Sequence, residues 1–175
     1  MAAGKILVAS EAGLFVFKLV GDVRKTASVP YQQTAALNAY AARLFQRENL
    51  DQVVIDLAEL TGIDSLHLGL LAQIGVSARQ RLNRTATVIS TNEAVTRQLR
   101  DMALDRLFRI IENPHDLPAA LQELPDMSVS EQQALKMTLE AHKALADLSD
   151  KNRETFRNVI ELLEAQHADP PPKDG

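Results

Sequence analysis

Short apolar runs alternate with amphipathic stretches along the first 125 residues, and this pattern predicts a domain of strands and helices. Two β-rich runs, 5–10 and 14–20, flank Glu11-Ala12-Gly13 and predict a hairpin that turns at Gly13. Three more apolar runs rich in β-branched residues predict strands, the last of them at a sheet edge. These strands are expected at residues 53–57, 85–89 and 107–111.

Apolar residues recur at helical spacing between these strands. One helix is expected to start at Val29-Pro30-Tyr31 with Ser28 as its cap, and others to begin near Ser65 and Asn92. Residues 116–124 are expected to form a further short helix, which Pro125 ends. The alternation of helices and strands predicts an α/β layer, in which a mixed sheet is covered by helices.

Residues 127–167 form a separate helical extension in this interpretation. Between 134 and 166 there is no Gly or Pro and helix formers dominate. Ser128 or Ser130 can cap the start, and Glu131, three residues after Ser128, gives a capping-box pattern with it. The polar residues 149–152 either continue one long helix or break it into a hairpin. An apolar seam runs along the extension through Leu145, Leu148, Phe156, Val159 and Leu163. This seam is expected to pack on its own domain, and the alternatives are a homo-oligomer or a partner protein.

The stretch 53–82 carries the most informative chemistry. Its strand runs to Asp56, and a short connection through Gly62 delivers Asp64 and Ser65 to the start of a helix. Asp and Ser are favoured helix caps, so a purely structural role is one interpretation of this pair. The exposed N–H groups and the positive dipole end of a helix also suit a phosphate. A modification site is therefore the other interpretation of this pair.

The strand VVIDL, the segment Gly62-Ile63-Asp64-Ser65 and the later Gly69-Leu70 resemble the signature of the STAS family of anti-sigma factor antagonists. The resemblance covers about residues 5–124, and it implies a STAS-type mixed sheet covered by helices. Leu66 and His67 stand where the usual pattern has Gly and Leu. The extension 127–167 is an addition to the usual domain, and residues 168–175, which are rich in Pro, are expected to be a disordered tail.

By this resemblance Ser65 is the phosphoacceptor of a switch. In the family, the unphosphorylated antagonist binds and sequesters an anti-sigma factor, itself a serine kinase, and a PP2C-type phosphatase reverses the modification. The resemblance also implies competing roles as a scaffold or regulatory subunit of a stress-signalling or lipid-transport complex. Asp22 either lines the same rim as Asp64 or is a solvated carboxylate at a strand end. The residues expected to contact a partner are Asp22, Asp64, Ser65, Leu66 and His67.

Composition narrows the remaining possibilities. The 175 residues are 46% hydrophobic and 24% charged, with a net charge of −4, so no global field favours nucleic acid or an anionic membrane. There is no Cys, which excludes disulfides and thiolate chemistry. We expect no signal peptide, no membrane span, a cytoplasmic location, no cofactor and, because the four His lie apart, no structural metal.

An enzymatic alternative rests on three carboxylates at predicted strand ends. Asp22, Asp56 and Asp64 could hold Mg²⁺ for phosphoryl transfer. Such a site also needs a cation for the phosphoryl oxygens, and neither strand 85–89 nor strand 107–111 supplies a Lys. His67 is expected to project to another side of the helix from Ser65, as an exposed or half-buried residue and not as a base. We therefore expect no catalytic activity.

Overall fold

A mixed β-sheet forms the centre of the molecule in the computed structural model, which describes residues 4–24, 31–113, 117 and 120–169. The chain runs through β1 (Lys5–Glu11), β2 (Leu14–Asp22), α1 (Gln32–Leu44), β3 (Gln52–Asp56), β4 (Leu60–Gly62), α2 (Ser65–Leu82), β5 (Ala86–Ile89), α3 (Glu93–Asp101), the 3-10 turn η1 (Leu104–Arg106), β6 (Phe108–Ile111), β7 (Gln122–Glu123), α4 (Glu131–Ala146) and α5 (Asp150–Ala168). Among these residues the strand order is β6-β5-β3-β2-β1-β7, with the short β4 added beside β2.

The predicted hairpin is present, and its geometry follows from its turn. Ala12 and Gly13 both have positive φ angles, 49° and 84°, as a tight two-residue connection of antiparallel strands requires. β1 and β2 pair antiparallel from Lys5↔Val20 to Glu11↔Leu14, whereas β2, β3, β5 and β6 are parallel neighbours. The sheet is therefore mixed, and the predicted fold class is confirmed.

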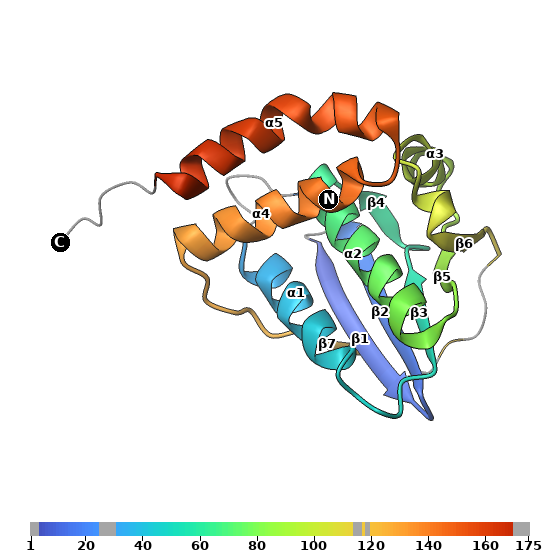
Figure 1. Cartoon of the computed structure of the whole chain (residues 1–175). Coiled ribbons are helices and arrows are strands. Elements are labelled where there is room, and N and C mark those ends of the chain that lie inside the picture. Colours follow the sequence, from blue (N-terminus) through green and yellow to red (C-terminus); the bar gives the residue numbers. More distant parts are fainter. Residues whose placement is uncertain (1–3, 25–30, 114–116, 118–119, 170–175) are drawn as a thin grey trace.

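Helices α1 and α2 lie on one face of the sheet, and α4 crosses them with α5 packed on its outer side (Figure 1). Large side chains between the sheet and these helices are fully buried, among them Phe17, Leu37, Ile55 and Leu71. A smaller apolar cluster that includes Val16 and Val54 lies on the opposite face. Both faces of the central strands are thus buried, which explains their continuous apolar runs.

The short helix predicted over 116–124 is wrong. Gln122 and Glu123 form β7 instead, which pairs antiparallel with Val8 and Leu7 at the edge of β1, and residues 114–116 and 118–119 lie outside the described part. Leu124 enters the main core while Leu121 packs against the cluster on the other face. The apolar residues here serve two faces of a sheet, and the open edge of β1 supplies the backbone partners that decide the conformation.

Two helix starts can be compared with the predictions. The first helix begins at Gln32, and the predicted cap Ser28 with Val29 and Pro30 lies outside the described residues. The cap of α4 is Ser130, one of the two predicted caps, but its capping-box partner is Gln133, whereas the predicted box paired Ser128 with Glu131.

The extension consists of two helices, as the hairpin alternative predicts: α4 ends at Ala146, and the polar residues 149–152 provide the cap and first turn of α5. The Ser149 hydroxyl accepts a hydrogen bond from the Asn152 amide at 3.1 Å and caps α5. Leu145 and Phe156 are buried in the main core, Leu148 and Val159 pack against it, and Leu163 is half-buried. The apolar seam therefore packs on its own domain in this chain, through contacts of α4 with α2 and α1.

Candidate functional site

The start of α2 is held in place by its neighbours on both sides. β4 pairs with the end of β2, so that Asp22 lies opposite Gly62. From α3, the Gln98 side-chain amide donates to the Ile63 carbonyl at 3.1 Å. Asp64 then takes an extended conformation as the N-cap, and Ser65 is the first residue of the helix. The predicted position of Asp64 and Ser65 at the start of a helix is thus confirmed.

Asp64 does more than cap the helix. Its Oδ1 accepts from the His67 backbone amide at 3.0 Å and lies 2.7 Å from His67 Nδ1. Because a carboxylate can only accept, Nδ1 carries a proton, and Nε2 lies 3.2 Å from the Thr34 hydroxyl. These bonds join α2 to α1 and fix the orientation of the Asp64 carboxylate.

His67 is only 2% exposed, so the expectation of an exposed or half-buried residue is wrong. The reason is the pairing with Asp64 and Thr34, which satisfies both ring nitrogens inside the protein. Leu66 is also buried, at 5%, and is part of the main core. Neither side chain is presented at the surface where a partner contact was expected.

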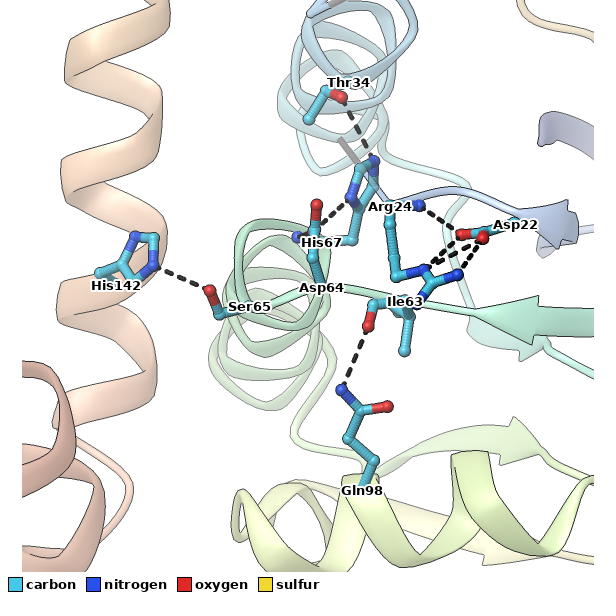
Figure 2. Close-up of polar contacts among 9 residues, drawn as sticks. All are labelled: Asp22, Arg24, Thr34, Ile63, Asp64, Ser65, His67, Gln98 and His142. Carbon is cyan, nitrogen blue, oxygen red and sulfur yellow. Dashed lines mark hydrogen bonds and ion pairs between the residues drawn. The ribbon is translucent and has the colours of Figure 1, made fainter. Parts of the chain in front are cut away.

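Ser65 faces the C-terminal extension. Its Oγ lies 3.0 Å from Nε2 of His142 on α4, and Nδ1 of that ring lies 2.7 Å from the Thr138 carbonyl. The carbonyl can only accept, so Nδ1 carries a proton, and Nε2 is the ring nitrogen that forms the hydrogen bond with the Ser65 hydroxyl. The ring also packs edge-on against Phe156 of α5, with 5.4 Å between centroids. Figure 2 shows Ser65 directed at His142 and away from Asp22 and Arg24.

Asp22 is paired with a cation that sequence analysis overlooked. The Arg24 guanidinium donates to both Asp22 carboxylate oxygens, through Nε at 2.9 and 3.0 Å and through Nη2 (Figure 2). This pairing holds the pKa of Asp22 below its ordinary value, while the nearby Asp64 carboxylate opposes the shift. Gly62 makes room for the pair, since a Cβ there would lie 2.6 Å from Asp22 Oδ1.

The three carboxylates of the enzymatic alternative have separate partners. Asp56 is buried, accepts from the Ala58 amide and lies 3.6 Å from Lys18 Nζ, which also contacts Glu59 at 2.5 Å. The Glu59 hydrogen bond raises the pKa of Lys18, and Asp56 adds to the shift against the cost of burial. Residues 4–24, 31–113, 117 and 120–169 contain no group of three His, Cys, Asp or Glu that could hold a metal ion. The geometry does not favour a Mg²⁺ site.

Sequence reasoning missed His142, Arg24 and Lys18, although two of them left a signal. His142 stands next to Ala141, which is four residues from Met137 and from Leu145, so the helical pattern places it beside the buried face of α4. Lys18 is opposite Asp56 in the parallel register of β2 and β3. The cation beside Asp56 thus comes from β2, which precedes Asp56 in the chain, and not from the strands that follow it.

The mixed sheet, its helical cover and the capped serine agree with the STAS-type fold that the sequence predicts. A family model for the STAS domain matches residues 14–117, and the chain belongs to the STAS-domain family. Domains of this family are in general regulatory and binding modules and not enzymes. No curated protein sequence matches the chain. Helices α4 and α5 lie beyond the matched residues, and no helix in the described part of the chain is long and apolar enough to cross a membrane.

Proposed function

We propose that this chain is an anti-sigma factor antagonist that works in the cytoplasm as a phosphorylation switch. With Ser65 unphosphorylated, it binds and sequesters a kinase-type anti-sigma factor and so frees a sigma factor. The observation that carries the proposal is the place of Ser65, directly after the Asp64 cap at the start of α2 in a STAS domain. The kinase and a PP2C-type phosphatase are the proposed partners.

The chemistry of the switch is a phosphoryl transfer to Ser65. A bond forms between Ser65 Oγ and the γ-phosphorus of ATP, the bond to the β-phosphate oxygen breaks, ADP leaves, and the hydroxyl proton passes to a base of the kinase. The product adds a charge of about −1.5 to −2 beside Asp64. Like-charge repulsion and desolvation then oppose docking of a partner on this surface. The positive end of the α2 dipole offsets part of the charge, so the domain stays folded.

Two substitutions of Ser65 test this proposal. The full chain is incubated with ATP and a kinase-type anti-sigma factor encoded beside its gene, and mass spectrometry maps the modified residue. Ser65 should be the modified residue, and Ser65→Ala should abolish labelling. Calorimetry should show that Ser65→Asp binds the unmodified partner at least about tenfold more weakly than Ser65→Ala, since one negative charge is placed beside Asp64. Labelling that persists in Ser65→Ala contradicts the proposal.

A further inference from the structure

Helix α4, with α5 packed against it, contacts the residue on which the proposed switch depends. We propose that the α4–α5 hairpin is an autoinhibitory cover: it occupies the binding surface around Ser65 and must undock before another protein can reach the Ser65 hydroxyl. This inference rests on the proposed function, because it assigns a regulatory step to the same serine. It concerns a segment that lies outside the residues matched by the family model.

The first argument is the contact at Ser65 itself. A reacting phosphorus has to come within about 3–3.5 Å of the attacking oxygen and to align with it. Nε2 of His142 already stands 3.0 Å from Ser65 Oγ, within hydrogen-bond distance, and His142 is only 6% exposed. Ser65 is half-buried, and its hydroxyl is directed at this ring (Figure 2). With Oγ in this position, a phosphoryl group attached to it would need the space that the ring fills.

The second argument is how closely α4 approaches α2. A Cβ added to Gly69 would lie 2.3 Å from the Ala141 carbonyl oxygen and 2.7 Å from the Ala141 Cβ. Gly69 is one helical turn beyond Ser65, and Ala141 precedes His142. The two helix backbones thus meet beside the serine, and Ala141 has no exposed surface. A second protein cannot enter between these helices while α4 is docked.

The third argument is that the hairpin can leave as a unit. Every strand pair of the sheet forms within residues 5–123, so undocking breaks none of them. The helices hold each other through the His142–Phe156 ring contact and a Lys143–Glu164 ion pair at 2.7 Å. Their connecting turn is pinned to the domain by polar contacts to backbone carbonyls, from Asn152 to Met102 and from Arg106 to Leu148.

A single engineered thiol tests the cover without any kinase. The chain has no Cys, so Ser65→Cys gives one reactive thiol and keeps a weak donor facing His142. Thr61→Cys in β4 is the control, because Thr61 is exposed and lies four residues earlier. The thiol reagent is a dithionitrobenzoate disulfide, added at a pH of about 9. This pH lies above the ordinary thiol pKa, so differences in thiol ionisation do not decide the labelling rate. Absorbance reports the labelling rate in the full chain.

Two substitutions undock the hairpin by different means. Gly69→Ala adds a methyl group that collides with the α4 backbone but suits the interior of α2. Asn152→Ala removes the hydrogen bonds that pin the turn, and Asn158→Ala on the exposed side of α5 is its matched control. Circular dichroism confirms that each variant retains its folded sheet and helices.

The thiol at position 65 should react at least about tenfold more slowly than the thiol at position 61, since it reacts only when the hairpin opens. Gly69→Ala or Asn152→Ala should raise the rate at position 65 at least about tenfold and leave that at position 61 unchanged. Equal rates at the two positions, or a rate at position 65 that neither substitution changes, would overturn the inference. A kinase that fails to modify Ser65 even in Gly69→Ala would instead contradict the proposed function.

Discussion

Asn152 is the side chain that ties the C-terminal hairpin to the STAS domain, and its replacement by alanine should be costly. It is 1% exposed, and its Nδ2 donates to the Met102 carbonyl at 2.8 Å and to the Leu145 carbonyl at 2.9 Å. The first bond joins α5 to the end of α3, and the second joins it to the end of α4. Alanine leaves both carbonyls without this donor.

The structure sets the size of the effect. A buried carbonyl that loses its donor costs about 1–3 kcal/mol. The Leu145 carbonyl also accepts from the Leu148 amide at 3.1 Å, so losing the Asn152 hydrogen bond to this carbonyl costs an amount at the low end of that range. Together with the small cavity left by the shorter side chain, we expect Asn152→Ala to lower the free energy of unfolding by about 2–4 kcal/mol.

Urea unfolding followed by circular dichroism measures this loss in the full chain. Asn158→Ala is the matched control, because Asn158 is exposed on the same helix, and its change should stay within about 0.5 kcal/mol. The loss of stability in Asn152→Ala can also appear as a separate unfolding of α4 and α5 at lower urea. The helical circular-dichroism signal would then fall before the main transition. Equal unfolding curves for the two variants would refute the reasoning.

Two further predictions concern the hairpin and the Asp22 pair. Removing residues 126–175 should lower the melting temperature, because Met137 and Phe156 belong to the main core. Light scattering should find both the full and the truncated chain monomeric. A dimeric full chain, together with a melting temperature that truncation leaves unchanged, would mean that the hairpin serves association instead. Arg24→Gln should raise the pKa of Asp22 toward its ordinary value of 3.8, since the guanidinium is removed. The pair stabilises the fold above that ordinary value and ceases to do so as the pH falls through the lowered pKa of the folded state. A carbon NMR titration of the Asp22 carboxyl that shows the same pKa in both forms contradicts this.

Local features of the sequence determined much of the fold. The turn at Ala12-Gly13, the apolar runs of β3, β5 and β6, and the cap at Asp64 each depend on residues within a few positions of one another. Their conformations follow from backbone preferences and short-range hydrogen bonds, which a single chain displays directly. The same reasoning placed Ser65 at a helix start and identified the STAS resemblance.

Other features depend on an opposing surface. Two leucines, Leu121 and Leu124, fit a helix by spacing, but the free edge of β1 made their segment a strand. The environment of His67 was misjudged because its partner Thr34 is 33 residues away on α1. In such cases local propensity is weak beside the backbone hydrogen bonds and burial that a neighbouring element supplies.

The contact between Ser65 and His142 depends most clearly on the tertiary structure. Sequence alone determined a serine at a helix N-terminus and an apolar seam that had to be buried. It left open whether that seam packs on its own domain or on another protein. Only the close crossing of α2 and α4, which Gly69 and Ala141 allow, brings His142 onto a hydroxyl 77 residues earlier in the chain. The physical reason is that helix packing depends on the shapes of two surfaces together, and neither surface specifies the contact by itself.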